Sequence, residues 1–504
     1  MTEVKRVTAQ SKKLAIAGIL LCITWLPALP AQQRDERPNF VFVLVDDFGW
    51  MDVGYNGSTF YETPRIDAFA AKGVRFNRAY ASSPMCSPTR VSIMTGKSPA
   101  RTGVTQYISG WRSSKFKYIA PLTKLYMTRR EKTLGEAFQQ HGYDTAFMGK
   151  WHMGNFTHGR PEDHGFDFSR AVIESNRCSM YFPFRGVQYF DDQKEGDYFT
   201  DKLTDEAIKY LQRQAGAGEP FLLYLAHFSM HAPIGSKPDL RRKYERKLDR
   251  LTPPSVDSIG APERFNHKNV KSRQDDPEYA GELENLDYNF GRVLDALEEF
   301  DLDENTVVVL TGDNGGRSSM WEKFPHPTSV KPLRGGKTLV FEGGIRVPTV
   351  VYRPRAAKLG TQIDVPIISA DFYPTLLEMA GLPLEEQQHL DGVSIAPLIE
   401  GRTIGERNLY WHFPHYQGEG GYPASAVFDG KYKLIHNYHF EEYSLFDVVV
   451  DPYERNNLAA DRPGIVERLK RDLNARLQGV GAQLPVKNTS ADIIDEIDEE
   501  HRDR

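Results

Sequence analysis

The sequence predicts an α/β fold, in which helices cover a large mixed, mostly parallel sheet and a smaller antiparallel α+β subdomain follows at the C-terminal end. Two patterns predict this fold: apolar runs alternate with helix-like segments up to about residue 400, and short strands joined by a tight turn come after it. The chain has 504 residues, of which 40% are hydrophobic. That is enough chain for one large domain and one smaller one.

Continuous apolar, β-branched runs predict strands that are buried on both faces, as in a parallel sheet. These runs lie at residues 39–45, 221–225 and 306–310. Helix-like segments lie between and around them, at residues 63–72, 131–141, 200–214 and 278–299. The alternation places the main domain at residues 38–400.

The pattern changes after residue 400, where the predicted strands become short and antiparallel. They lie at residues 424–428, 432–437 and 444–447. The dipeptide Asp429-Gly430 between the first two is typical of a hairpin turn. A helix at 463–478 would pack on this small sheet, so we expect a subdomain at 401–484 and a charged tail at 485–504.

The first 31 residues have the layout of a secretory signal. Basic residues come first, at Lys5, Arg6, Lys12 and Lys13. An apolar run at 14–26 and the small residues Ala28 and Ala31 follow. The run is shorter than the roughly 18 residues of a spanning helix, so we expect export to the periplasm or beyond and no stable membrane insertion. An uncleaved anchor is the alternative.

Net charge limits the partners of the exported chain. Residues 1–31 hold four basic residues and one acidic residue, so their removal lowers the formal net charge from −5 to −8. An acidic protein binds nucleic acid poorly without a local basic surface. We therefore expect no nucleic-acid partner, and an anionic substrate would be recognised by a few cationic side chains in a pocket.

Polar residues follow two of the predicted strands directly. Asp46 and Asp47 follow the first strand, and Asp313 and Asn314 follow the strand at 306–310. Ligands of open α/β sheets bind beyond the carboxyl ends of the strands. Carboxylate and amide oxygens suit Ca²⁺ or Mg²⁺. A helix cap or a turn is the other use of such pairs, and the residue types alone leave both open.

The segment from Cys86 to Arg90 contains Pro88 and Thr89, which suit the first turn of a helix. Cys86 would then lie at or just before a positive helix N-terminus, where a thiolate is stabilised. A thiol at a helix cap is the plain alternative. Cys178 is the only other cysteine beyond residue 31, and either a bridge to Cys86 or an inert buried thiol is open for it.

The stretch from Cys86 to Gly96 resembles the signature of type I sulfatases, members of the alkaline phosphatase superfamily. In that family a maturation enzyme converts the cysteine of the motif C-x-P-S/T-R to formylglycine. Further family blocks follow in the expected order, at 149–152, 231–233, 313–315, 336–337 and 342–346. The likeness covers nearly all of the mature chain and is strongest to bacterial relatives of N-acetylgalactosamine-6-sulfatase and arylsulfatase.

The resemblance implies hydrolysis of sulfate esters, with a sulfated glycosaminoglycan or algal polysaccharide as the expected substrate. It implies one Ca²⁺ as cofactor, held by Asp46, Asp47, Asp313, Asn314 and the modified residue 86. It also implies the catalytic side chains, which are those of Cys86, Arg90, Lys150, His152, His231 and Lys337. Arg90 and Lys150 would hold the formylglycine diol, His152 would accept its proton, and His231 and Lys337 would hold the sulfate.

Residues beside these blocks are candidates for the subsite of the leaving group, since loops and aromatic rings often recognise sugars. They are Glu174, Ser175, Asn176, Arg177, Arg317, Trp321 and His326. Solvated loop residues are the alternative for each of them.

Two other functions remain open: hydrolysis of phosphate or phosphonate esters by the same superfamily, and an inactive homologue that only binds sulfated glycans. The intact catalytic set argues against the second, because a protein that only binds needs no nucleophile.

Overall fold

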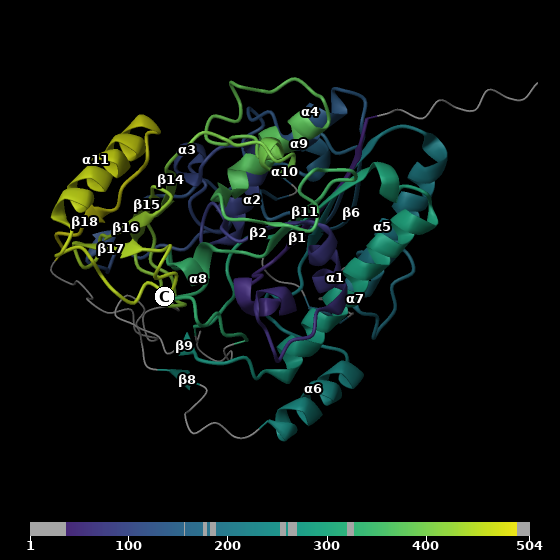
Figure 1. Ribbon diagram of the computed structural model, residues 1–504, viewed down its shortest axis with the longest axis horizontal. Coiled ribbons are helices and arrows are strands. Elements are labelled where there is room, and N and C mark those ends of the chain that lie inside the picture. Colours follow the sequence, from purple (N-terminus) through teal and green to yellow (C-terminus); the bar gives the residue numbers. More distant parts are fainter. Residues whose placement is uncertain are drawn as a thin grey trace, which may run out of the picture. The chain divides into compact units, whose positions relative to one another are not determined.

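An eight-stranded sheet forms the centre of the main domain in the computed structural model (Figure 1), with the order β12-β2-β11-β10-β1-β7-β5-β6. The strands are β1 (Asn39–Val45), β2 (Val74–Phe76), β5 (Asp144–Lys150), β6 (Phe168–Ile173), β7 (Phe221–His227), β10 (Thr306–Gly312), β11 (Thr349–Tyr352) and β12 (Gln362–Ile363). In this sheet β11 runs antiparallel to both of its neighbours, and the other pairs are parallel. The predicted mostly parallel sheet is thus confirmed.

The structure describes residues 37–155, 157–174, 179–181, 188–251, 259–260, 270–319 and 327–490, and the chain from Arg37 onward forms one compact unit. The predicted signal at 1–31, Cys178 and residues 491–504 of the predicted tail lie outside the described residues. None of the helices within the described ranges is long and apolar enough to cross a membrane.

Helices cover both faces of the sheet (Figure 1). They are α1 (Pro64–Lys72), α2 (Cys86–Thr95), α4 (Leu134–Gln139), α5 (Phe199–Ala217), α7 (Pro277–Glu299) and α9 (Phe372–Met379). Side chains of β1 alternate between two apolar clusters. Val41, Val43 and Val45 pack with α1, α5 and α7. The alternate residues from Phe40 to Leu44 pack with α2, α4 and α9.

The helix α4 is shorter than the predicted helix at 131–141. Thr133 caps its first turn by accepting from the N–H of Glu136 over 3.2 Å, and Glu136 accepts from the N–H of Thr133 over 2.8 Å. This capping box makes the chain enter the helix at residue 134. The strand β5 has the sequence DTAFMGK. Its apolar run is only Ala146 to Met148, between Asp144-Thr145 and Gly149-Lys150, so no long continuous run predicts it.

A four-stranded antiparallel sheet forms the predicted C-terminal subdomain. Its strands are β14 (Leu409–Phe413), β15 (Ala424–Phe428), β16 (Tyr432–Asn437) and β17 (Glu442–Asp447), in that order. The helix α11 (Pro463–Gly479) packs on it through Leu469, Leu473 and Leu477. The strand β18 (Val486–Lys487), in the segment predicted as tail, pairs with β4 (Tyr118–Ile119).

Shorter elements complete the described chain. They are β3 (Ala79–Tyr80), β8 (Ile259–Gly260), β9 (Val270–Lys271), β13 (Ile367–Ile368), α3 (Pro99–Thr102), α6 (Pro238–Arg250), α8 (Glu342–Ile345) and α10 (Ala396–Ile399).

A buried ion-pair cluster joins the C-terminal sheet to the main domain. The Nζ of Lys433, on β16, lies 3.1 Å from Oε1 of Glu342 and 3.0 Å from Oε1 of Glu454. All three side chains are at most 1% exposed. Glu342 is the first residue of α8 and also accepts from the hydroxyl of Tyr80. The cluster therefore anchors the segment that follows Lys337.

Replacement of Lys433 by Met is expected to destabilise the protein by about 3 kcal/mol, because removal of one partner leaves buried carboxylates uncompensated. Lys431→Met is the matched control. Lys431 pairs with Asp447 at the surface, so its loss costs about 1 kcal/mol or less. Thermal and urea unfolding measure both effects, and equal midpoints for the two variants would contradict the anchoring role.

Candidate active site

Two neighbouring strands end at the same edge of the sheet, and the predicted acidic residues follow both ends. β1 and β10 pair in parallel, with Val45 opposite Gly312. Asp46 and Asp47 therefore leave the sheet beside Asp313. The N–H of Asp47 donates to Oδ1 of Asp313 over 3.1 Å. Asp47 has a left-handed φ of 50°, which turns the chain sharply after the strand.

Cys86 is the first residue of α2, a helix that is buried along its whole length, and Pro88 and Thr89 lie in its first turn as predicted. The partial positive charge of a helix N-terminus favours an anion near residue 86. The Cys86 thiol is free and buried. Burial raises its pKa to about 11, so the thiol stays protonated at neutral pH.

Arg90 and Lys150 place positive charge against the carboxylates. The Arg90 guanidinium donates through Nε to Oδ2 of Asp313 over 2.8 Å, and through Nη1 to the carbonyl of Lys150 over 2.7 Å. The Lys150 ammonium contacts Oδ2 of Asp46. Both cations are buried, so each charge is balanced by protein groups in place of water.

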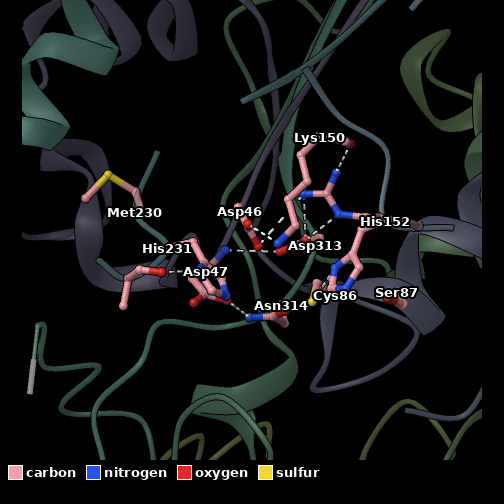
Figure 2. A network of polar contacts seen from close by, with 12 residues as sticks. Asp46, Asp47, Cys86, Ser87, Lys150, His152, Met230, His231, Asp313 and Asn314 are labelled. Carbon is pink, nitrogen blue, oxygen red and sulfur yellow. Dashed lines mark hydrogen bonds and ion pairs between the residues drawn. The ribbon is translucent and has the colours of Figure 1, made fainter. Parts of the chain in front are cut away.

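His152 is oriented by a backbone carbonyl. Its Nε2 lies 2.6 Å from the carbonyl oxygen of Ile108, which can only accept, so the neutral ring carries its proton on Nε2. Nδ1 then presents its lone pair to Sγ of Cys86, 3.3 Å away (Figure 2). Burial, followed by the charges of Lys150 and Arg90, holds the pKa of His152 well below its usual value. The ring is therefore neutral and able to accept a proton.

Lys337 and His231 complete the predicted catalytic set. The Nζ of Lys337 lies 2.8 Å from Oδ1 and 2.9 Å from Oδ2 of Asp47. Nδ1 of His231 lies 2.6 Å from the carbonyl oxygen of Ala232, so this nitrogen carries the proton of the neutral ring. Burial, then the charge of Lys337, holds the pKa of His231 well below its usual value.

A carboxylate that the sequence pattern does not mark positions the segment around His231. Glu282, a buried residue of α7, accepts from the N–H of Met230 over 3.0 Å and from that of Gly235 over 2.8 Å. Met230 has a left-handed φ of 80°, so its backbone needs such support. In the sequence Glu282 is one of several acidic residues in an amphipathic helix, and only the structure reveals its contacts.

The oxygen atoms at the edge of the sheet fit a hard cation. Oδ1 of Asp46 and Oδ1 of Asn314 are buried and have no hydrogen-bond partner among the described residues. Nδ2 of Asn314 donates to Oδ1 of Asp47 over 2.8 Å, which leaves its amide oxygen for another partner. Ligand atoms of Asp46, Cys86 and Asp313 lie within 4.8 Å of one another. These oxygens suit Ca²⁺, and the sulfur is the one soft atom in the set.

Because the site is buried, its carboxylates depend on neighbouring positive charge to remain ionised. Burial raises the pKa of Asp46 to about 6, and the nearby charge of Asp313 adds to this effect. A bound divalent cation would favour the ionised carboxylates. The predicted metal ligands and the predicted catalytic residues thus form one cluster.

The candidates for the leaving-group subsite are less fully placed. Ser175, Asn176, Arg177, Trp321 and His326 lie outside the described residues. Glu174 directly follows β6. Arg317 is buried beyond the end of β10, and its Nε lies 3.1 Å from Oε1 of Glu419 in the C-terminal subdomain. The sequence pattern marks Arg317 but gives no reason to single out Glu419.

Comparison with known families agrees with this geometry. The Sulfatase family matches residues 38–382, and this range contains every predicted catalytic and metal-binding residue. The family described as N-sulphoglucosamine sulphohydrolase, C-terminal, matches residues 336–483, which include the C-terminal sheet.

Several characterised proteins are similar over most of their length. The steryl-sulfatase of Homo sapiens is 26% identical and the match covers 91% of this chain and 90% of that protein. The ulvan-active sulfatase of Formosa agariphila is 28% identical over 95% of this chain and 89% of its own. The N-acetylgalactosamine-6-sulfatase of Canis lupus familiaris is 28% identical, and the match covers 82% of this chain and 74% of that protein.

A solved structure shows the same fold. The crystal structure of Ps i-CgsB in complex with k-i-k-neocarrahexaose has a TM-score of 0.69 and 25% identity, covering 88% of this chain and 93% of that chain. Because the family match spans more than half of the sequence, this chain belongs to the Sulfatase family and is an enzyme that hydrolyses sulfuric esters.

Proposed function

We propose that this sulfatase removes sulfate from a sulfated carbohydrate, such as a glycosaminoglycan or an algal polysaccharide, with a formylglycine made from Cys86 and one Ca²⁺. The position of Cys86 carries the proposal, since it lies among the oxygens of Asp46 and Asp313 and 3.3 Å from Nδ1 of His152. A thiol with a pKa of about 11 is a poor nucleophile at neutral pH. An oxygen at this position would make the ligand set entirely hard.

In the first step, one hydroxyl of the hydrated formylglycine loses its proton to solvent and attacks sulfur, forming an O–S bond as the S–O bond to the sugar oxygen breaks. Ca²⁺ held by Asp46, Asp47, Asp313 and Asn314 would supply positive charge that lowers the pKa of this hydroxyl. Lys337 holds its proton tightly, because Asp47 raises its pKa in spite of burial. We therefore assign charge neutralisation to Lys337. The anionic sulfate group of the substrate would raise the low pKa of His231, so that its Nε2 takes up a proton from solvent and donates it to the sugar oxygen.

In the second step, Nδ1 of His152 accepts the proton of the other hydroxyl, and the C–O bond to sulfate breaks. The aldehyde re-forms and sulfate leaves. The carbonyl of Ile108, 2.6 Å from Nε2, stabilises the imidazolium that results. Arg90 and Lys150 neutralise charge beside residue 86.

The carbohydrate assignment is supported by the ulvan-active relative and by the oligosaccharide complex of Ps i-CgsB. The similarity to a steryl-sulfatase makes a steryl ester the alternative substrate. Parallel assays separate a carbohydrate sulfatase from a sulfatase of other alcohols and from a phosphatase. The substrates are sulfated galactose, N-acetylgalactosamine and rhamnose, an aryl sulfate and the matching phosphate ester. Faster turnover of the phosphate ester would overturn the proposal.

We also propose that the chain is exported through residues 1–31 and modified by a formylglycine-generating enzyme. The basic residues followed by a short apolar run support export. The unbroken motif from Cys86 to Arg90 supports the modification.

Co-expression with a maturation enzyme is expected to replace the Cys86 thiol by an aldehyde oxygen, as read from the mass of the peptide that contains it. Cys86→Ala is expected to abolish turnover of sulfate esters and to keep the thermal midpoint near that of the wild type. Cys86→Ser keeps one hydroxyl but lacks the second, so it should stop after one turnover. An active protein with unmodified Cys86 would refute the mechanism.

Removal of Ca²⁺ by a chelator is expected to lower kcat by on the order of a hundredfold or more, and added Ca²⁺ should restore it. Asn314→Leu removes one oxygen ligand and should raise the Kd for Ca²⁺ by at least about tenfold, measured by calorimetry. Full activity in a sample shown to be free of metal would exclude the role of Ca²⁺.

Glu282→Ala is expected to lower kcat for sulfate esters by about tenfold to a hundredfold, with a smaller change in KM, because His231 loses its position in the transition state. Glu284→Ala is the control, since Glu284 lies in the same helix and pairs with Lys243 at the surface. Equal kcat values for the two variants would show that Glu282 has no positioning role.

A further inference from the structure

A loop of the C-terminal subdomain reaches the catalytic centre. It consists of residues 414–421, between β14 and β15. Oε1 of Glu419 lies 3.1 Å from Nε of Arg317, just beyond β10. The N–H of Lys337 donates to the carbonyl oxygen of Gly316, the residue before Arg317, over 3.0 Å. The ion pair with Arg317 therefore places Glu419 beside the segment that carries Lys337, the cation assigned to the sulfate.

A second loop, which follows α3, lies between this loop and residue 86. Oγ1 of Thr105 lies 2.8 Å from Nε2 of His415. The N–H of Ile108 donates to Oγ of Ser87 over 3.1 Å. Gln106 lies between these two contacts in the chain, so it is held between the C-terminal loop and the start of α2.

Both loops contain buried polar atoms without a partner. Among the described residues, Oε2 of Glu419, Nε2 of Gln417 and Nε2 of Gln106 are buried and make no hydrogen bond. Each of these residues is at most 8% exposed. Buried polar groups are nearly always paired, and an unpaired group is costly. Three such atoms, on two loops that contact Arg317 and the start of α2, indicate a ligand that pairs with them.

We propose, on the basis of the function proposed above, that Glu419, Gln417 and Gln106 bind hydroxyl groups of the sugar that carries the sulfate ester. One carboxylate oxygen and two amide N–H groups match sugar hydroxyls, each of which both donates and accepts. The pair with Arg317 holds one oxygen of Glu419 and leaves the other for the ligand. An apolar alcohol would leave all three atoms unpaired, so the subsite selects against aryl and steryl esters.

The test compares two substrates of the full-length, formylglycine-containing enzyme. One is 4-methylumbelliferyl sulfate, and the other is whichever monosulfate of galactose, N-acetylgalactosamine or rhamnose the wild type hydrolyses fastest. The readout is the ratio of kcat/KM for the sugar to kcat/KM for the aryl ester. Glu419→Gln, Gln417→Leu and Gln106→Leu are each expected to lower this ratio about tenfold or more. Glu441→Gln, an exposed carboxylate of the same subdomain, should change it less than twofold.

The outcomes separate this subsite from the chemistry of the enzyme. If kcat/KM falls by the same factor for the sugar and for the aryl ester, the ratio stays constant. The three residues then only support the fold, and the proposal is overturned. It is also overturned if the wild type hydrolyses the aryl sulfate but none of the sugars, although the sulfatase chemistry then stands. A modified wild type that hydrolyses no sulfate ester would overturn the proposed function itself.

Discussion

The structure depends on the mutual compensation of charges buried at the carboxyl edge of the parallel sheet. Three carboxylates follow β1 and β10, and three cations come from α2, from β5 and from the segment before α8. A buried charge without a partner costs several kcal/mol. Each element must therefore be placed accurately for the others to be stable, which couples folding of the main domain to assembly of the catalytic centre.

The same electrostatics assign the roles of the two histidines. Burial and neighbouring cations keep His152 and His231 neutral, and a backbone carbonyl selects the protonated nitrogen of each ring. His152 is thereby prepared to accept a proton from residue 86. A neutral ring also adds no further positive charge to a site that already holds three cations and is suited to a divalent ion.

The C-terminal subdomain contributes to the centre by two different contacts. The Lys433 cluster anchors the start of α8 and so supports the segment that carries Lys337. The loop at 414–421 brings Glu419 into contact with Arg317, just beyond β10. A rigid sheet that presents a variable loop is a common way to alter specificity without disturbing the chemistry. In our proposal, the main domain performs the reaction, and the subdomain together with Gln106 selects the alcohol.

The sequence by itself determined the parallel core and the small C-terminal sheet, because apolar runs are local in the chain. Its resemblance to type I sulfatases implied the residues that converge on Cys86. The sequence did not predict β5, because the apolar run of that strand is only three residues long, and it made α4 too long. Only the tertiary structure decided the proton positions on His152 and the parts assigned to Glu282 and Glu419. Their contacts join residues far apart in the chain, and the identity of a side chain does not specify which distant backbone group or ion pair it will meet.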